Sequence, residues 1–215
     1  MARISIVTDV LKKNDAAAAV TRNRLDAAGV VALNIISAPG SGKTTLLERT
    51  LRHLGDDAPG AVLVGDLQTA RDAERLAPHA AGVVQINTGR GCHLSADQVA
   101  AGLERIDLNT IRYLFIENVG NMVCPVSFDL GEHYRVAILS VPEGDDKVAK
   151  YPTLFQTADV IVINKIELTE LLEFDEHRVT TDLAQVNTAA PVIRVSARTG
   201  QGLDVWFAWL RALVS

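Results

Sequence analysis

The stretch VALNIISAPGSGKTTLLERTLRHL, residues 31–54, decides the fold of this chain. It joins an apolar run, a glycine-rich turn and an amphipathic helical pattern, in the order that a phosphate-binding loop requires. Gly40 and Gly42 let the backbone direct its N–H groups toward phosphate oxygens, and a helix beginning at Lys43 adds its positive dipole end. Lys43 is predicted to bind the β- and γ-phosphates, and the Thr44 hydroxyl to ligate Mg²⁺. The predicted phosphate-binding residues are Gly40, Ser41, Gly42, Lys43, Thr44 and Thr45.

One position departs from the usual form of this motif. The common pattern has glycine six residues before the lysine, and here Ser37 occupies that place. The glycines nearest the phosphates are kept, and the strand, lysine and hydroxyl are all in register. The alternative, a glycine-rich turn without a ligand, is therefore disfavoured, and a nucleotide with Mg²⁺ is the predicted ligand.

Six further apolar runs follow along the chain, with helical patterns between them. The predicted strands are 31–37, 61–66, 83–87, 112–118, 134–141, 160–164 and 192–196. The predicted helices are 9–28, with Thr8 as N-cap and Gly29 as its end, 43–54, 69–77, 95–105, 150–157, 179–188 and 202–213. This alternation predicts an α/β fold whose mainly parallel, open sheet is flanked by helices. Residues 118–133 carry no helical pattern, so the strands on either side are not expected to be simple parallel neighbours.

Composition limits the class of protein. With 215 residues, 48% of them hydrophobic, the chain suits one domain with a substantial core, and we expect a helix in 1–29 packed on a domain of residues 30–215. A net charge of −5 argues against general nucleic-acid binding. No apolar run reaches the length of a signal peptide core or a membrane span. Two cysteines are too few for a disulfide framework, which favours a reduced, cytoplasmic protein.

Two carboxylates end predicted strands, where open α/β sheets bind ligands. Asp66 ends AVLVGD, and Glu117 ends YLFIE and opens ENVG. Both are predicted to reach Mg²⁺ and, with Lys43, to form the catalytic set; Asp66 alone also fits a helix cap or turn residue. The Gly120 N–H is predicted to contact the γ-phosphate, which makes it a sensor of the triphosphate. Asn121 stands where small GTPases carry glutamine, so we expect slow intrinsic hydrolysis.

The motif NKIE, residues 164–167, follows an apolar run and resembles the guanine-reading sequence Asn-Lys-X-Asp. Asn164 and Lys165 match it, and Glu167 replaces the aspartate that accepts two hydrogen bonds from guanine. The sequence SAR then places Ser196 and Ala197 where a backbone N–H contacts guanine O6. Together these residues favour GTP over ATP, although NKIE alone also fits an exposed turn entering a helix.

Two cysteines and one histidine form a candidate metal site. Cys92 and His93 adjoin in NTGRGCHL, where Gly89 and Gly91 indicate a loop, and Cys124 follows the predicted nucleotide sensor. Thiolate and imidazole ligate Ni²⁺ or Zn²⁺, with water or a second copy of the chain completing the set. The alternative is that the cysteines are small buried hydrophobes. If they are ligands, movement of the sensor loop gives nucleotide state a route to metal affinity.

The remaining histidines and two lysines carry weaker signals. His53, His79, His133 and His177 lack Cys or His neighbours and are interpreted as surface or structural residues. Lys147 and Lys150, in EGDDKVAKYP, are interpreted as solvated side chains; the alternative is that one supplies a cation to the nucleotide across a dimer.

Four longer blocks carry a family resemblance. They are GDLQT (65–69), QINTGRGCHL (85–94), FIENVGNMVCPVSFDLGE (115–132) and EGDDKVAKYP (143–152). In order and content they resemble the hydrogenase nickel-incorporation GTPase family HypB, from about residue 30 to the end of the chain. The resemblance implies a phosphate-loop fold of the signal-recognition-particle, MinD and BioD class. It also implies a Mg²⁺-dependent GTPase that acts as a metallochaperone switch and delivers nickel during [NiFe]-hydrogenase maturation.

The resemblance further implies specific sites and partners. Cys92, His93 and Cys124 match the family's nickel or zinc site at the interface of a GTP-dependent homodimer. Leu168 and Leu172 fall where the family places dimer contacts. The implied partners are the maturation protein HypA and the hydrogenase large subunit. This N-terminus has neither the cysteine motif nor the histidine-rich stretch of some members, so nickel storage is not expected.

Two other functions remain open at this point. The first is an accessory GTPase for another nickel enzyme such as urease, although the Gly-Cys-His block fits the hydrogenase family better. The second is a metal-binding protein whose nucleotide site serves only dimer assembly, without useful turnover.

Overall fold

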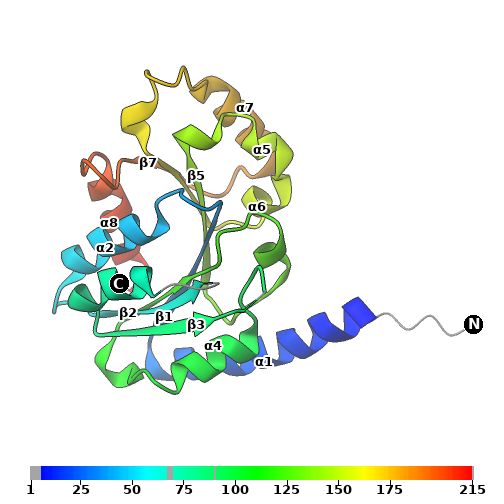
Figure 1. The fold of residues 1–215 in the computed structure, drawn as a ribbon, viewed down its shortest axis with the longest axis vertical. Helices are drawn as coiled ribbons and strands as arrows, with labels where there is room; N and C mark the ends of the chain where they lie inside the picture. The colour runs from blue at the N-terminus through cyan, green and yellow to red at the C-terminus, as the bar shows by residue number, and fades with distance from the viewer. Residues whose placement is uncertain (1–5, 67–69, 90, 215) are drawn as a thin grey trace, which may run out of the picture.

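A seven-stranded sheet, all of whose paired strands are parallel, forms the centre of the molecule (Figure 1). The computed structural model describes residues 6–66, 70–89 and 91–214. The strands are β1 (Val31–Ser37), β2 (Gly60–Asp66), β3 (Gly82–Asn87), β4 (Tyr113–Glu117), β5 (Tyr134–Ser140), β6 (Val160–Asn164) and β7 (Val192–Val195). Each lies within one residue of its prediction. Their order is β3-β2-β4-β1-β5-β6-β7, so β1 separates β4 from β5, and the expectation drawn from residues 118–133 is confirmed.

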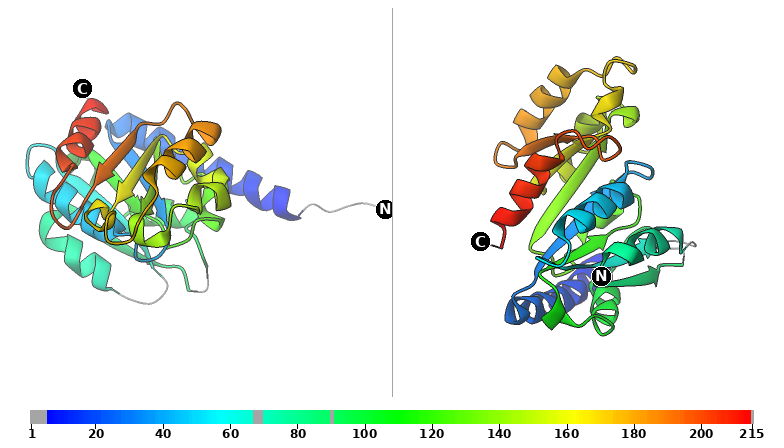
Figure 2. Two further views of the ribbon diagram at one scale, coloured as in Figure 1. Left: turned by 90° about the horizontal axis from the view of Figure 1, so that it is seen from above. Right: turned by 90° about the vertical axis from the view of Figure 1, so that its left-hand side faces the viewer.

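Helices cover both faces of this sheet (Figure 2). They are α1 (Ile6–Ala28), α2 (Lys43–Leu54), α3 (Arg71–Leu76), α4 (Ala96–Leu103), α5 (Lys147–Lys150), α6 (Pro152–Gln156), α7 (Glu176–Val186) and α8 (Leu203–Ala212). Because successive side chains of a strand point to opposite faces, Leu33 and Ile35 face the core beneath α2 and α8. Ala32 faces the core beneath α1 and α4, and Ile36 faces the core beneath α5 to α7. The predicted fold class is confirmed.

Four helix predictions were wrong in detail. The helix predicted at 179–188 is α7, which begins three residues earlier, at Glu176, because the Asp175 side chain caps it by accepting from the Arg178 N–H. The first helix begins at Ile6, so Thr8 lies inside it and does not cap it; Gly29, with φ +67°, does end it. Within the predicted helix 150–157, α5 ends at Lys150 and α6 begins at Pro152, because Pro152 has no N–H to continue α5. Of the predicted helix 69–77, residue 69 lies outside the described residues, and α3 passes at residue 77 into the 3₁₀ turn η1 (Ala77–His79).

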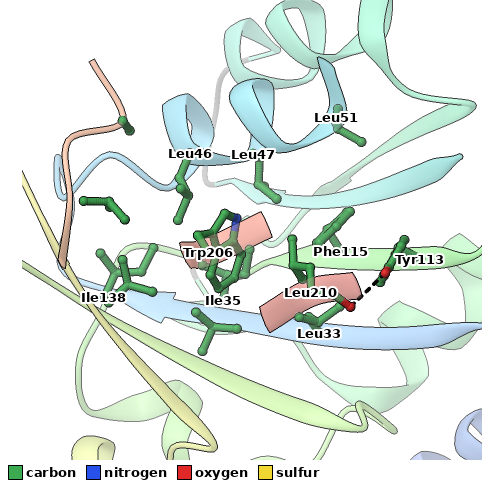
Figure 3. Close-up of a cluster of buried hydrophobic side chains, with 14 of the residues drawn as sticks. Leu33, Ile35, Leu46, Leu47, Leu51, Tyr113, Phe115, Ile138, Trp206 and Leu210 are labelled. Atoms are coloured by element: carbon green, nitrogen blue, oxygen red, sulfur yellow. Dashed lines mark hydrogen bonds between the residues drawn. The ribbon is translucent and has the colours of Figure 1, made fainter. Parts of the chain in front are cut away.

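Two buried hydrogen bonds fix α8 against α2 and β4. The Trp206 indole Nε1 donates to Thr50 Oγ1 of α2 at 2.8 Å, and the Tyr113 hydroxyl of β4 donates to the Leu210 carbonyl at 2.9 Å (Figure 3). Trp206 and Tyr113 are fully buried, and buried polar atoms are costly when unpaired. The first bond therefore helps to orient α2, which starts at the phosphate loop, and the second ties α8 to β4. Among the described residues, no helix has the length and apolar character needed to span a bilayer.

Candidate nucleotide and metal site

A cavity of about 500 Å³ opens at the carboxyl edge of the sheet. Parallel strands end on the same side, so loops from distant parts of the sequence meet there. The lining combines the phosphate loop with the ends of β2 and β4 and part of α3. It consists of Pro39, Gly40, Gly42, Lys43, Thr44, Thr45, Gly65, Asp66, Asp72, Arg75, Glu117, Asn118, Val119, Gly120 and Lys165.

The phosphate loop has the backbone conformation that its glycines permit. Gly40 and Gly42 have φ of +76° and +98°, values that L side chains rarely adopt. The Lys43 ammonium donates to the Ser37 hydroxyl at 3.1 Å, and Ser37 and Ser41 share a hydrogen bond between their hydroxyls. Ser37, the departure from the common motif, therefore holds the Lys43 side chain across the loop. Burial lowers the pKa of Lys43, and the Glu117 carboxylate is the strongest opposing influence.

Thr44 and Glu117 form the candidate magnesium site. The Thr44 hydroxyl donates to Glu117 Oε1 at 2.7 Å, while Glu117 Oε2 is buried without a hydrogen-bond partner among the described residues. Burial raises the pKa of Glu117 to about 7. A buried carboxylate oxygen lacking a partner beside a hydroxyl oxygen fits Mg²⁺, which takes oxygen ligands. Asp66, at the end of β2, lines the same cavity.

Gly120 rests directly on the phosphate loop. A Cβ at this position would lie 2.9 Å from Pro39 Cα, closer than real Cβ atoms approach backbone. Only glycine allows the chain after β4 to pass so near the phosphate loop, so a shift of Pro39 toward Gly120 would displace this residue. The predicted sensor therefore lies beside the nucleotide cavity, which it also lines.

Asn164 joins the phosphate loop to the predicted base-binding segments. Its Nδ2 donates to the Ser41 carbonyl at 2.8 Å, and its Oδ1 accepts from the backbone N–H of Lys165 at 2.8 Å and of Ala197 at 3.1 Å. A Cβ on Gly42 would lie 2.5 Å from Asn164 Nδ2. This fully buried amide thus explains why glycine is needed there.

The other predicted base-binding residues lie around Asn164 in different states. The Lys165 ammonium donates to the Gly40 carbonyl at 2.6 Å. Glu167 is half-buried outside the cavity lining, and its Oε2 is buried without a hydrogen-bond partner in the described part of the chain. The N–H of Ser196 donates to the Gln201 carbonyl, so this N–H and that of Ala197 are engaged inside the protein.

Cys92, His93 and Cys124 come together beside the nucleotide cavity. One ligand atom from each lies within 4.8 Å of the others. Cys92 is exposed and Cys124 is half-buried, which does not fit the alternative of small buried hydrophobes. The interaction with the Cys124 thiol is the main cause that raises the pKa of Cys92. Burial lowers the pKa of His93, which favours the neutral imidazole that binds metals.

Local contacts shape the loop that carries Cys92. After β3, the Thr88 N–H donates to the Asp66 carbonyl at 3.1 Å, and the Gly91 N–H donates back to the Thr88 carbonyl at 2.9 Å. The His93 ring stacks on Phe128, with centroids 3.9 Å apart, so its orientation is held by the loop that follows Cys124.

Two charged residues of the cavity lining were not predicted from the sequence. Asp72 and Arg75 face the cavity from α3, and the Arg75 guanidinium donates to Glu48 Oε2 at 2.8 Å and to Thr45 Oγ1 at 3.3 Å. Their spacing of three residues on a predicted helix was the available signal, but helical spacing alone does not indicate which face meets the nucleotide.

The residues interpreted as structural make contacts away from the cavity. His53 stacks on Phe207, His79 accepts from Arg52, His133 accepts from the Ala32 N–H, and His177 is exposed. Lys147 lies 5.9 Å above the Tyr151 ring, and Lys150 pairs with Asp146. Of the predicted dimer contacts, Leu168 packs partly against the core, whereas Leu172 is 47% exposed beside Leu171 at 76%.

Comparisons with known proteins agree with this geometry. Residues 31–194 match the CobW/HypB/UreG nucleotide-binding domain. The hydrogenase maturation factor HypB of Azotobacter vinelandii is 50% identical over 207 residues, which cover 96% of this chain and 68% of that protein. The crystal structure of Helicobacter pylori HypB in complex with nickel is 40% identical, with a TM-score of 0.89 over 94% of this chain and 95% of that one.

A more distant likeness concerns the fold alone. The signal recognition particle receptor FtsY of Elizabethkingia anophelis, solved in complex with GDP, is 12% identical, with a TM-score of 0.55 over 76% of this chain and 56% of that one. The predicted similarity to the signal-recognition-particle class of phosphate-loop folds is therefore confirmed.

Proposed function

Because this chain belongs to the HypB family of hydrogenase maturation factors, we propose that it is a Mg²⁺-dependent GTPase that delivers nickel during [NiFe]-hydrogenase maturation. The observation that carries the proposal is one short loop. It starts at the Glu117 carboxylate, passes Gly120 on the phosphate loop, and reaches Cys124 of the three-residue metal cluster. Only six residues, 118–123, therefore separate Glu117 of the nucleotide site from Cys124 of the metal cluster.

GTP is the proposed nucleotide. Asn164 and Lys165 donate hydrogen bonds to the Ser41 and Gly40 carbonyls of the phosphate loop. This contact places the base-reading segment next to the phosphate loop, so that one nucleotide can bind to both. The Glu167 oxygen without a partner among the described residues supplies an acceptor for the guanine N1–H and N2–H₂ donors. Adenine has no such pair of donors on that edge.

The chain's own residues account for hydrolysis of the γ-phosphate. Lys43 and the loop amides bind the phosphate oxygens and stabilise the charge that grows as water attacks. Thr44, Glu117 and Asp66 would hold Mg²⁺, which supplies positive charge to the β- and γ-phosphates when bound. Asp66 either orients the attacking water or holds only a metal-bound water. With Asn121 in place of glutamine, unaided turnover is slow.

Nickel is the proposed cargo of Cys92, His93 and Cys124, and zinc shares these ligands. One chain supplies three ligands, so water or a second copy completes the set. The structure of the Helicobacter pylori relative was solved in complex with nickel, which supports the choice of metal. We further propose a GTP-dependent homodimer with Leu172 at its interface, transfer partners of the HypA type, the hydrogenase large subunit as recipient, and a cytoplasmic location.

One experiment tests both parts of this proposal. GTP hydrolysis and nickel affinity are measured for the wild type, Lys43→Ala and Cys124→Ala. We expect Lys43→Ala to lose hydrolysis by at least about 100-fold while keeping nickel binding without nucleotide. Cys124→Ala should lose nickel affinity and keep hydrolysis. The proposal is contradicted if the wild type does not hydrolyse GTP with Mg²⁺. It is also contradicted if the nickel affinity of the wild type does not depend on the bound nucleotide.

A further inference from the structure

The two loops that carry the metal cluster are tied together by the side chain of Asn121. Its Nδ2 donates to the Cys92 carbonyl at 3.4 Å. Its Oδ1 accepts from the Val123 N–H at 2.8 Å and from the Cys124 N–H at 3.4 Å. One amide therefore contacts the backbone of both cysteines. Asn121 also directly follows Gly120, the residue pressed against Pro39 of the phosphate loop.

A second asparagine, Asn118, anchors the loop that carries Cys92 and His93, which is called the metal loop below. Asn118, which is 1% exposed, accepts from the Leu94 N–H at 3.2 Å and from the Val119 N–H at 3.0 Å through Oδ1. Leu94 follows His93 and is fully buried, and its side chain fills the space that a Cβ on Gly65 would need. The end of the metal loop is thus fixed to the ends of β2 and β4.

This anchor belongs to a buried polar network. Asn118 Nδ2 donates to Asn34 Oδ1 at 3.1 Å, and Asn34 Nδ2 donates to Glu132 Oε1 at 3.2 Å. The Glu132 carboxylate also accepts from Arg135 Nε at 2.8 Å and from the Leu130 N–H at 2.7 Å. Hydrogen bonds between buried groups are costly to leave unmade, so this network resists displacement.

The hydrogen bonds of Asn118 and Asn121 therefore differ in how easily they can be broken. The bonds of Asn118 are buried, whereas Asn121 is half-exposed and two of its three bonds are 3.4 Å long. Water can replace an exposed hydrogen bond at little cost. A shift of Gly120 would move Asn121 first, while the Leu94 end of the metal loop stays in place.

We propose that Asn121 is a positioning residue that transmits the nucleotide state from Gly120 to the metal cluster. When the phosphate loop moves Gly120, the Asn121 amide changes the separation of the Cys92 and Cys124 backbones, and with it the geometry offered to nickel. The inference rests on the proposed function, because it requires nucleotide and nickel to bind the same chain. It adds the side chain that couples them.

Three variants of the full chain separate the contributions. Asn121→Ala removes every bond of the amide, whereas Asn121→Asp keeps the oxygen that accepts from Val123 and Cys124 but cannot donate to Cys92. Asn109→Ala is the matched control, since Asn109 is an exposed asparagine in a local turn with Asp107. Nickel affinity is measured by competition with a chelator, with GDP and with a non-hydrolysable GTP analogue. The thiolate-to-nickel absorption band reports the ligand geometry.

The expected readout is the ratio of the two nickel affinities. We expect a ratio away from one in the wild type and in Asn109→Ala, and a ratio near one in Asn121→Ala, with GDP affinity within about twofold of wild type. Loss of exposed hydrogen bonds should lower nickel affinity itself by roughly three- to tenfold. The absorption band should change with nucleotide in the wild type and not in Asn121→Ala. Asn121→Asp should give a ratio between these limits.

Two results would overturn the inference, and they are distinguishable. If the wild type shows a nucleotide-dependent ratio and Asn121→Ala keeps it, Asn121 does not transmit the state although the proposed function stands. If the wild type itself shows equal nickel affinity with both nucleotides, the coupling in the proposed function fails, and the role of Asn121 fails with it.

Discussion

The Thr44 hydroxyl donates a 2.7 Å hydrogen bond to Glu117, and this bond joins the first turn of α2 to the carboxyl end of β4. Both side chains are buried, and the second carboxylate oxygen has no partner among the described residues. A hydroxyl and a carboxylate so arranged would form one face of the proposed magnesium site.

Replacing Glu117 with glutamine tests this face. Glu117→Gln keeps an oxygen that can accept from Thr44 but removes the charge that Mg²⁺ requires. We expect Mg²⁺-dependent GTP hydrolysis to fall by at least about 100-fold, with GDP binding in the absence of Mg²⁺ little changed. Glu104→Gln, an exposed carboxylate paired with Arg24, is the control. Hydrolysis within a few-fold of wild type would remove Glu117 from the catalytic set.

The raised pKa of Glu117 predicts how stability depends on pH. Burial raises this pKa from its ordinary 4.5 to about 7, so between these values the folded, ligand-free chain holds a proton that the unfolded chain releases. Stability from this group is therefore highest below about pH 4.5 and falls until about pH 7. Denaturant unfolding at pH 5 and pH 8 should show Glu117→Gln gaining up to about 3 kcal/mol relative to wild type at the higher pH. A pH-independent difference would contradict the raised pKa.

Asn164 should control the affinity for the phosphates as well as for the base. Asn164→Ala removes the clamp on the Ser41 carbonyl and releases the Ala197 N–H. We expect GDP and GTP affinities to fall together by roughly 10- to 100-fold, measured by calorimetry with Mg²⁺. Asn109→Ala should leave both unchanged. A loss confined to one nucleotide would show that the clamp does not act through the phosphate loop.

Glu167 should determine guanine selectivity. Glu167→Gln replaces one acceptor oxygen with a donor, which faces the guanine donors unfavourably. The ratio of GTP to ATP affinity should drop by roughly 10- to 100-fold, and Glu167→Asp should retain most of the preference. Glu170→Gln changes an exposed carboxylate three residues later and serves as the control. An unchanged ratio in Glu167→Gln would mean that other groups read the base.

Arg75 offers a cation at the rim of the phosphate cavity. Its guanidinium contacts Thr45 and Glu48, and Arg75 lines the cavity in which the phosphates are proposed to bind. We expect Arg75→Ala to lower kcat for GTP by roughly tenfold or more, with less effect on GDP affinity. Arg52 also pairs with Glu48 but does not line the cavity. Arg52→Ala should therefore leave kcat near wild type. Equal kcat in Arg75→Ala and Arg52→Ala would contradict a role for Arg75 at the γ-phosphate.

Much of this architecture is encoded locally, in short segments of the chain. Strands such as β1 and helices such as α2 follow from apolar periodicity, which acts over a few residues. The phosphate loop follows from Gly40 and Gly42, because their positive φ is open to glycine and closed to most other residues. The order in which β4 and β5 flank β1 was anticipated only in part, since strand pairing is a long-range contact.

Other features depend on contacts between distant segments. Arg75 lines the cavity because α3 packs beside α2, and no pattern within the six residues of α3 reveals that. Asn118 and Leu94, 24 residues apart, meet because β2 and β4 are neighbours in the sheet. The helix split at Pro152 was readable from the proline but masked by the apolar pattern around it.

Residue types and local spacing were enough to specify a phosphate loop on a parallel sheet, because backbone dihedral preferences and burial periodicity act over short segments. They identified Cys92, His93 and Cys124 as candidate ligands but left open whether the thiols were buried hydrophobes. Their convergence within 4.8 Å arises only when the ends of β3 and β4 are placed at one edge of the folded sheet. The Asn121 and Asn118 contacts arise in the same way, because a side-chain amide acquires its partners from the neighbours that the fold gives it.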